Sequence, residues 1–193
     1  MREKAGVVVR PWCRADAAAL HAAVRSSMAA LCGWLPWCHP DYGPDDALSW
    51  VTHCEQAWAR RTEFPLGVFA AAGGDVLGGT GINHLVPAFR MGNLGYWVAS
   101  PHCGRGVART AAALAADIGF RDLGLTRIEI IVLLQNESSQ RVAEAVGARR
   151  EGIARNRLVL HGVPQDAIVY GLVPGDLPQA LAHAPAAVAS QNP

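Results

Sequence analysis

The chain has 193 residues, of which 51% are hydrophobic and 17% charged, and its formal net charge is +1. This length suits one domain with a sizeable core, and the charge balance argues against broad electrostatic binding to nucleic acid or to an anionic membrane. No stretch approaches the roughly 20 apolar residues of a spanning helix, and the N-terminus, MREKAGVVVRPW, lacks the apolar run and cleavage site of a secretion signal. We therefore expect a cytoplasmic globular protein.

The five cysteines contain no CxxC pair. Cys38 is next to His39 and His53 is next to Cys54, but neither pair has a second half at zinc-ligand spacing, so we expect no metal site. We expect the cysteines to be buried or incidental thiols in a reducing compartment.

The N-terminal part of the chain predicts a strand, a helix and an irregular segment. Residues 6–10 (GVVVR) form a short β-branched run that ends at Pro11, which is typical of a strand. The Ala/Leu-rich run 16–25 predicts a helix. The segment 26–42 contains GWLPWCHP and has too many Gly and Pro residues for a regular element.

A second helix is predicted from Pro44 to about Arg61. Proline suits the first position of a helix, and Asp45 and Asp46 are favourable in the first turn. The face expected to be buried comprises Leu48, Val51, Cys54, Glu55 and Trp58.

Three strands and a long helix follow. The strand patterns are 65–72 (PLGVFAAA), 76–84 (VLGGTGINH) and 92–99 (GNLGYWVA), and the turn 73–75 (GGD) joins the first two as a hairpin. Residues 105–122 have strong helical periodicity.

A strand, a helix and three further strands are predicted toward the C-terminus, at 127–134, 137–146, 148–154, 156–160 and 165–172. The run after Asp176 is rich in Ala and Pro and predicts disorder. We therefore expect one domain at 1–175 and a disordered tail at 176–193.

The order of elements is β-α-α-β-β-β-α-β-α-β-β. The strand, long helix and strand within 92–134 form a crossover unit, so those two strands should lie parallel. Because the preceding hairpins are antiparallel, the fold class is α/β (α+β) with a mixed sheet.

A glycine-rich loop, SPHCGRGVA (100–108), joins a strand to the long helix. Gly104 and Gly106 let the backbone approach a ligand, and the helix N-terminus favours a phosphate, with Arg105 and Arg109 adding positive charge. Such a loop is by itself often only a turn, and it fits neither a P-loop nor a dinucleotide-binding fingerprint.

Several motifs in one order resemble the GNAT N-acetyltransferase superfamily, namely GYWV (95–98), GRGVA (104–108), NESS (136–139) and VGARREG (146–152). Upstream, 31–37 and GTGINH (79–84) are similar to the RimJ/RimL-like branch, which acetylates the N-termini of ribosomal proteins. The resemblance covers roughly 6–174. It implies a mostly antiparallel sheet of about seven strands, flanked by helices, with a central parallel pair that splays around acetyl-CoA.

The resemblance also implies the residues that contact acetyl-CoA, which are Val98, Ala99, Cys103, Gly104, Arg105, Gly106, Val107, Ala108, Arg109, Asn136, Ser139 and Arg141. A backbone amide near Val98 or Ala99 would point at the thioester oxygen. Two positions depart from the family pattern. Cys103 stands where Gln or Arg is usual, which weakens one contact on the phosphate side, and Ala148 replaces an aromatic residue.

Ser139 and Glu151 are the implied catalytic residues. Ser139 would protonate or hydrogen-bond the leaving thiolate, although Asn136 as a helix cap with Ser139 three positions later has a purely local explanation. Glu151 would be the general base, directly or through water; the alternative is a surface carboxylate paired with a nearby arginine. His84 is the second candidate base, since histidine ordinarily titrates near neutrality.

The acceptor site is less defined by the sequence. Trp34 and Trp37 are candidates for lining it together with His84, because loops broken by proline often carry binding residues; packing of the loop is the competing explanation. Arg141 would reach a phosphate of the coenzyme or would be solvated.

The function expected is acetyl-CoA-dependent acetylation of a primary amine, with the α-amino group of a protein or peptide N-terminus as the first choice. The alternatives are a small-molecule amine, such as an antibiotic, a polyamine or an amino acid, and a catalytically silent acyl-CoA sensor. The expected partners are acetyl-CoA and the acceptor, with a homodimer as an option, and neither nucleic acid nor a membrane. The expectation includes no metal.

Overall fold

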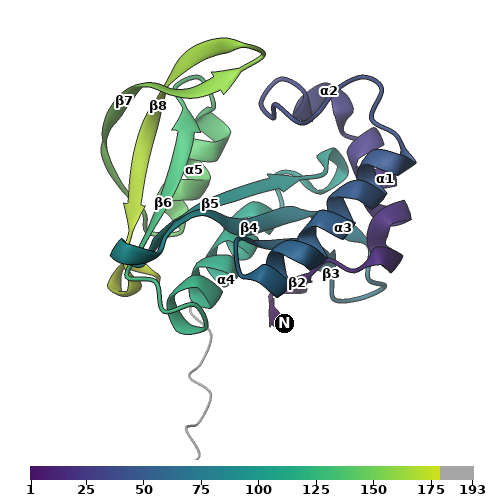
Figure 1. Ribbon diagram of the computed structural model, residues 1–193, viewed down its shortest axis with the longest axis horizontal. Coiled ribbons are helices and arrows are strands. Elements are labelled where there is room, and N and C mark those ends of the chain that lie inside the picture. Colours follow the sequence, from purple (N-terminus) through teal and green to yellow (C-terminus); the bar gives the residue numbers. More distant parts are fainter. Residues whose placement is uncertain (179–193) are drawn as a thin grey trace, which may run out of the picture.

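The structure is a computed structural model that describes residues 1–178, and over that range it contains one eight-stranded sheet with the order β1-β2-β3-β4-β5-β6-β8-β7 (Figure 1). The strands are β1 (Arg2–Lys4), β2 (Val7–Pro11), β3 (Phe64–Ala70), β4 (Val76–Val86), β5 (Met91–Val98), β6 (Arg127–Leu133), β7 (Arg149–Leu160) and β8 (Val163–Leu172). The α-helices are α1 (Ala17–Arg25), α2 (Met28–Leu31), α3 (Pro44–Arg60), α4 (Val107–Arg121) and α5 (Glu137–Ala145). Short 3₁₀ turns are η1 (Arg14–Asp16), η2 (Pro87–Phe89), η3 (Ser100–His102) and η4 (Pro174–Asp176).

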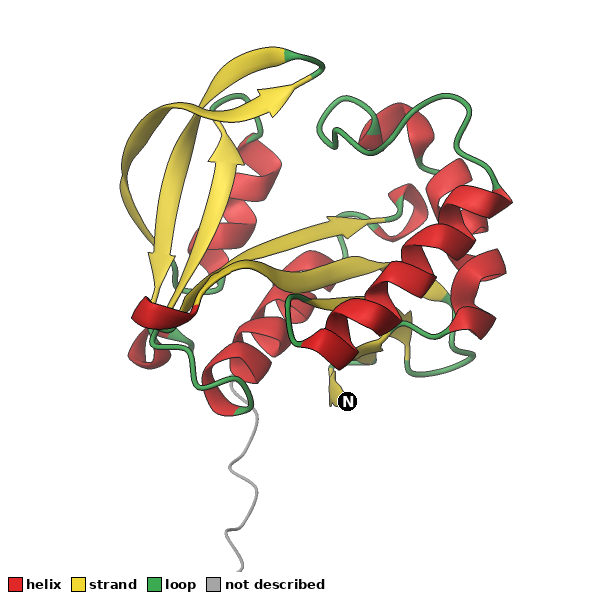
Figure 2. Cartoon of the chain, viewed as in Figure 1, coloured by secondary structure: helices red, strands yellow, loops and turns green. Residues whose placement is uncertain are grey.

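The parallel pair predicted from the sequence is β5 and β6, and the other neighbouring strands of the sheet run antiparallel. Residues 91–93 of β5 pair with 127–129 of β6, and the described part of the chain has no further rung between these two strands. Figure 2 shows the strands separating beyond that point. The backbone edges of β5 and β6 therefore face an opening in the middle of the sheet.

Helices cover both faces of the sheet. On one face α4 and α5 pack over a core that includes Leu66, Ile82 and Leu94, and on the other face α1 and α3 pack over a core that includes Leu20 and Val51 (Figure 1). The alternation of side chains along each strand supplies both cores, because successive residues point to opposite faces.

Helix α4 is buried along most of its length, and the buried alanines at 111–113, 115 and 116 permit close packing because their side chains are small. A buried carboxylate in this helix, Asp117, forms ion pairs with Arg2 at 3.2 Å and Arg121 at 2.7 Å. Such pairing is required because an unpaired buried charge is costly. The ion pair between Arg2 and Asp117 also links β1 to α4.

The structure corrects several predicted elements. Strand β1 was not predicted, and the expected strands at 148–154 and 156–160 are one strand, β7. The sheet has eight strands, where the resemblance implies about seven. Within β7, Asn156 has φ 51° and its N–H donates to the Asp166 side chain. The sequence around this irregularity resembles a break between two strands, but the strand continues through it. The segment 26–42 contains the short helix α2.

The buried face of α3 agrees with the prediction only in part. Val51 and Cys54 are fully buried as expected, but Leu48 is 44% exposed, Glu55 is exposed and Trp58 is half-buried. Ala47 and Ala57 are buried in their place. The 47, 51, 54 spacing continues one helical stripe, and the small Ala47 fits where the helix approaches α1. At the start of α3 the Gly43 N–H donates to the Asp46 side chain at 2.8 Å, as expected for an acidic first turn.

Cys32 and Cys38 form a disulfide, so the prediction that the cysteines are thiols is wrong for this pair. The turn after α2 brings their Cα atoms to 4.8 Å, a separation that a disulfide can bridge. Cys13 and Cys103 are exposed free thiols, and Cys54 is a buried one.

The predicted tail at 176–193 lies mostly outside the described residues. At its start, Asp176 pairs with Arg149 at 3.1 Å and Leu177 packs against the core, so the domain continues past residue 175. Among residues 1–178, none of the helices combines the length and the apolar character that crossing a membrane requires.

Candidate active site

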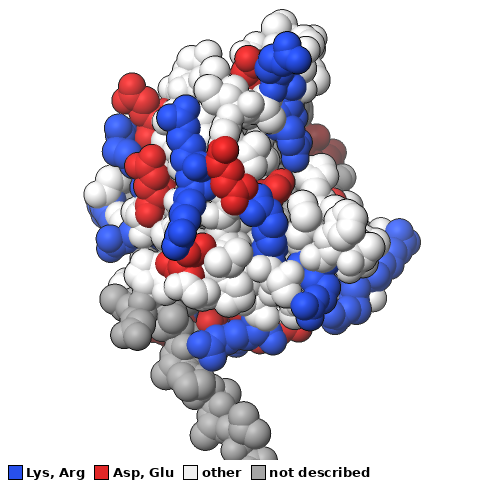
Figure 3. Space-filling view, turned by 90° about the vertical axis from the view of Figure 1, so that its left-hand side faces the viewer, with Lys and Arg blue, Asp and Glu red and all other residues white. Residues whose placement is uncertain are grey.

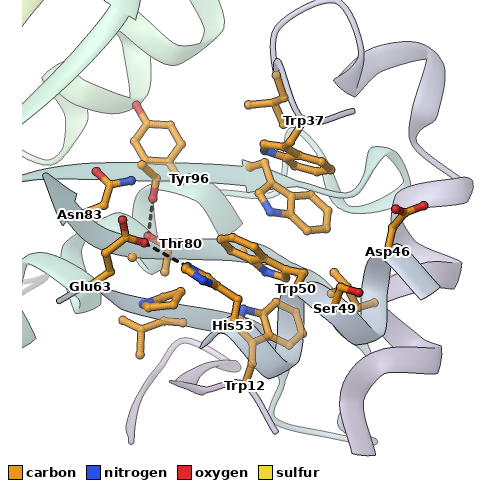
Figure 4. Close-up of a pocket in the computed structure, with 18 of the residues that line it drawn as sticks. Trp12, Trp37, Asp46, Ser49, Trp50, His53, Glu63, Thr80, Asn83 and Tyr96 are labelled. Carbon is orange, nitrogen blue, oxygen red and sulfur yellow. Dashed lines mark hydrogen bonds and ion pairs between the residues drawn. The ribbon is translucent and has the colours of Figure 1, made fainter. Parts of the chain in front are cut away.

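A cavity of about 570 Å³ lies between the sheet and the α1–α3 layer (Figure 4). Its floor is made by Gly79 and Gly81 of β4 and Gly95 of β5, with Gly81 directly opposite Gly95 in the antiparallel register. A Cβ atom placed on Gly95 would meet no other atom within 4 Å. The missing side chain at Gly95 therefore leaves open space above the sheet.

Aromatic side chains form one wall of this cavity, contributed by Trp12, Tyr42, Trp50, Trp97 and Trp37. Trp37, from the segment after α2, packs edge-on against Trp97 of β5 with ring centroids 6.0 Å apart. The cavity is therefore suited to a ligand with an apolar portion.

Two histidine–carboxylate pairs supply the charged groups of the cavity. His53 Nε2 lies 3.5 Å from Glu63 Oε2, and His39 Nε2 lies 3.9 Å from Asp46 Oδ2. The described lining residues include no lysine and no arginine. A cationic ligand would therefore meet the Glu63 and Asp46 carboxylates and no lysine or arginine among the described lining residues.

A second cavity of about 160 Å³ occupies the opening between β5 and β6. Its lining includes residues 94–96 of β5, residues 130–133 of β6, and Asn136 and Ser139 at the start of α5. Leu35, Gly95 and Tyr96 line both cavities, so the two spaces adjoin at these three residues.

Backbone amides of β5 point into the opening at alternate positions. The Ala99 N–H donates to Leu77 O of β4 at 2.8 Å, and the Thr80 hydroxyl donates to Gly95 O at 2.9 Å, so residues 95, 97 and 99 direct their polar groups toward β4. The amides of Tyr96 and Val98 consequently face the side of β6. Of the two predicted amides, Ala99 is already used by the sheet and Val98 remains suitably directed.

The start of α5 brings a serine and a tyrosine together. Asn136 caps the helix by accepting the Ser139 N–H at 3.0 Å, as the sequence predicted. The Tyr96 hydroxyl donates to Ser139 O at 3.0 Å and lies 3.0 Å from Ser139 Oγ. Burial raises the pKa of Tyr96 to about 12, so its hydroxyl keeps its proton at neutral pH.

The glycine-rich loop has the backbone geometry expected for an anion site. Gly104 and Gly106 have φ values of +74° and +77°, which favour glycine, and Gly106 is the N-cap of α4. The first amides of this helix have no intrahelical acceptor and point out of its N-terminus. Cys103 directs its thiol back to the Val98 and Ala99 carbonyls, at 3.8 and 3.7 Å, instead of toward the loop amides.

The structure places Glu151, the predicted base, outside both cavities. Its carboxylate accepts two hydrogen bonds from Arg127, at 2.8 and 2.5 Å, and lies outside the lining of both cavities. The hydrogen bonds from Arg127 hold the pKa of Glu151 below its usual value of 4.5, which weakens it as a proton acceptor. It is a paired carboxylate, although its partner is Arg127 and not one of the nearby arginines on its own strand.

Three other predicted residues also neither line the aromatic cavity nor make the contact expected of them, although an exposed Arg141 agrees with the solvated alternative. His84 is exposed at an irregularity of β4, with φ 46°, and lines neither cavity. Trp34 lines the cavity between β5 and β6 and not the aromatic cavity, where only Trp37 of the two lies. Arg141 is exposed and pairs with Glu137 at 3.5 Å on α5.

Sequence reasoning missed Tyr96, His53 and Glu63 as site residues. Tyr96 is the second residue of the motif GYWV, so the motif itself could have indicated this residue. His53 and Glu63 lie ten residues apart across the end of α3, and no local spacing marks them as a pair. Among the described residues, no group of three or more His, Cys, Asp or Glu side chains is arranged to hold a metal ion.

A mixed sheet whose parallel pair opens beside a glycine-started helix, with a second cavity adjoining the opening, defines an acyltransferase of the GNAT class. The chain belongs to this family, since the profile of the Acetyltransferase (GNAT) domain matches residues 7–149. The predicted family, its fold and its activity as an N-acetyltransferase are thereby confirmed.

Individual relatives agree with this assignment. The chain is 30% identical over 127 residues to a Bacillus subtilis protein named as the probable N-acetyltransferase YjcK, covering 65% of this chain and 70% of that protein. RimJ of Mycobacterium smegmatis, solved in complex with CoA-disulfide, is 30% identical with a TM-score of 0.78, covering 91% and 86%. The ribosomal-protein-S5-alanine acetyltransferase of Vibrio fischeri shares the fold, with a TM-score of 0.79 at 22% identity, covering 92% and 98%.

Proposed function

We propose that the protein transfers the acetyl group of acetyl-CoA to the α-amino group of a protein or peptide N-terminus. The observation that carries this proposal is the junction of two cavities at Leu35, Gly95 and Tyr96. An acyl donor in one cavity and an amine in the other would bring their reacting atoms together there, and such positioning is a large part of catalysis in group transfer.

The residues around the opening fit acetyl-CoA. The amides at the start of α4, with Arg105 and Arg109, would hold the pyrophosphate, and the unpaired edges of β5 and β6 would hold the pantetheine arm. When bound, the coenzyme supplies a thioester that an amine can attack. The N–H of Val98 would donate to the thioester oxygen. The related RimJ of Mycobacterium smegmatis, solved in complex with CoA-disulfide, supports this use of the fold.

Ser139 and Tyr96 together are suited to the departing sulfur. Tyr96 donates to the Ser139 carbonyl, which leaves the Ser139 hydroxyl at the edge of the same cavity with the tyrosine oxygen as its neighbour. A thiolate that leaves there would accept a proton from this pair. The presence of this pair favours an active enzyme over a silent acyl-CoA sensor.

The acceptor cavity is the less restrictive half of the site. Its carboxylates and aromatic wall fit an ammonium group attached to an apolar side chain. A small-molecule amine is the second candidate, because about 570 Å³ lies within the range that small ligands occupy. Homodimer formation stays a prediction.

A substitution at the junction tests the proposal. A Cβ atom added at Gly95 has no other atom within 4 Å, and valine is favoured in strands. The Gly95→Val variant should therefore fold normally. The added methyl groups should separate donor and acceptor and lower acetyl transfer by about 100-fold or more, since small misplacements have such effects. Thiol release from acetyl-CoA is measured with a panel of peptide N-termini and small amines.

Two results would contradict the proposal. Wild-type protein that releases no thiol above the acceptor-free rate with any amine would contradict the transferase assignment. Wild-type activity in a folded Gly95→Val variant would show that the reaction does not occur at the junction. Acetylation of small amines alone would replace the protein acceptor by the second candidate.

A further inference from the structure

We infer that His53, oriented by Glu63, is the proton acceptor for the amine substrate. This inference rests on the proposed function, because it assigns a role within the same acceptor cavity. His53 projects from α3 and Glu63 immediately precedes β3, and their side chains meet in the cavity with Nε2 and Oε2 3.5 Å apart (Figure 4).

The position of the pair within the sheet brings it near the reaction junction. In the sheet register Phe64, the residue after Glu63, is opposite Ile82, and Ile82 is opposite Leu94. Two strand spacings, roughly 10 Å, therefore separate the start of β3 from β5, next to Gly95. Side chains that extend into the cavity from Glu63 and His53 cover part of this distance, and an amine or one water molecule can cover the rest.

The other titratable groups of the cavity are less suitable. His39 and Asp46 form a similar pair, but Figure 4 shows Asp46 at the opposite end of the cavity from Tyr96, whereas Glu63 and Asn83 lie at the Tyr96 end. Burial raises the pKa values of Tyr42 and Tyr96 to about 12, so both keep their protons. The polar side chains that β4 contributes, Thr80 and Asn83, are uncharged, β5 contributes Tyr96 and Trp97, and α1 contributes Leu20.

Histidine and its carboxylate have complementary parts in this chemistry. An imidazole in its neutral form accepts a proton near neutral pH, and a neighbouring carboxylate orients the ring and stabilises the imidazolium that forms. The side chain of His53 is about half exposed, at 52%, so it can return its proton to solvent between turnovers. The lack of lysine and arginine in the described lining leaves no cation to oppose the incoming ammonium.

The complete transfer balances with these groups. The substrate ammonium gives one proton to His53, which releases it to solvent, and the amine nitrogen then attacks the thioester carbon, forming the N–C bond. The C–S bond then breaks and its electron pair leaves with sulfur. His53 takes the second nitrogen proton, and the Ser139–Tyr96 pair gives a proton to sulfur. His53 then releases its proton to solvent and the pair regains one, which yields the amide and free thiol.

Variants of the pair test the inference on an acceptor that the wild type acetylates. His53→Ala should lower kcat about 100-fold at pH 7, with the KM for acetyl-CoA unchanged, as expected for loss of a positioned base. Added imidazole should restore part of the rate, and the deficit should shrink as pH rises and more amine is neutral. Glu63→Gln should lower kcat about 10-fold. Glu55→Gln removes a carboxylate on α3 that contacts Arg14 outside the cavity and should keep the wild-type kcat.

The outcomes separate the inference from the proposed function. A wild type that acetylates no amine contradicts the proposed function itself. An active wild type with a His53→Ala variant that binds acetyl-CoA normally by calorimetry and keeps the wild-type kcat and pH profile overturns the inference. If His53→Ala does not fold, His53→Gln preserves a hydrogen-bonding side chain at that position, and its pH profile decides in the same way.

Discussion

At the scale of single residues, the Ser139–Tyr96 contact distinguishes two roles of Ser139, one at the cap of α5 and one at the leaving thiolate. The sequence alone does not distinguish them. The cap of α5 uses the Ser139 backbone N–H and the Asn136 side chain, whereas the Ser139 hydroxyl faces Tyr96. Removing the hydroxyl therefore leaves the cap hydrogen bond in place. The two roles can be tested by different substitutions.

Ser139→Ala should lower kcat by about 10- to 100-fold with little change in acetyl-CoA affinity, because the hydroxyl acts on the leaving group. Tyr96→Phe should have an effect of similar size, since it removes the hydroxyl partner. Steady-state kinetics and calorimetry with acetyl-CoA measure both quantities. Asn136→Ala serves as the control for the cap and should instead lower the free energy of unfolding by about 1 kcal/mol. If Ser139→Ala keeps the wild-type kcat and lowers the stability, Ser139 acts only at the start of the helix.

At the scale of elements, Arg127 connects two neighbours of β8. Its guanidinium, on β6, binds Glu129 of the same strand and Glu151 of β7, on the far side of β8. Figure 3 views the β7–β8 side of the molecule, where acidic and basic side chains lie next to one another. The Glu151–Arg127 pair is thus a structural link between strands within a surface of mixed charge.

Glu151→Gln should reduce stability slightly while leaving kcat and its pH profile unchanged. Because the carboxylate is exposed, the loss of free energy of unfolding at pH 7 should be below about 1 kcal/mol. Arg127 lowers the pKa of Glu151, so the stabilisation is present above pH 4.5 and is lost as pH falls through the lowered pKa. Denaturant unfolding at several pH values should show the variant and the wild type converging in acid. A kcat deficit that recovers at high pH would return Glu151 to the base role.

The elements that sequence patterns predict best are those determined by local chemistry. Pro44, the acidic turn after it and the Asn136 cap define helix starts, and the crossover rule defines the parallel pair β5–β6. The predictions that failed depend on tertiary contacts. The β1 strand is held by the ion pair of Arg2 with Asp117, 115 residues away, and β7 continues through Asn156 because Asp166 of the partner strand accepts its N–H.

At the scale of the whole molecule, the half of the site proposed for acetyl-CoA follows from the sequence, and the half proposed for the acceptor does not. The donor half lies in one continuous stretch, from β5 through α4 to α5, where the spacing of glycines and of the NESS motif is visible. The cavity proposed for the acceptor is assembled from Trp37, His53, Glu63 and Gly95, which come from four separate segments of the chain. Their convergence depends on how α3 packs over the sheet, and no sequence spacing records it.

The choice of acceptor follows from the strength of the base that the molecule provides. At pH 7 an α-amino group with a pKa near 7.8 is about one part in seven neutral, whereas a lysine with a pKa near 10.4 is neutral in about one part in a few thousand. A single histidine–carboxylate pair that is half open to solvent suffices for the first group. Deprotonating a lysine would require a more strongly desolvated site, and the exposed fractions of His53 and Glu63, 52% and 37%, do not provide one.

We therefore predict acetylation of α-amino groups in preference to lysine side chains, by about 100-fold or more at pH 7 according to the neutral fractions. The measurement uses a peptide with one internal lysine and its matched form with a blocked N-terminus, followed by mass mapping of the acetyl group. The preference should decrease as pH rises toward 10, because the neutral fraction of lysine then increases while that of the α-amine is already complete. Acetyl groups found mainly on the internal lysine at pH 7 would contradict the preference, since the cavity would then have to supply desolvation that its open His53–Glu63 end does not offer.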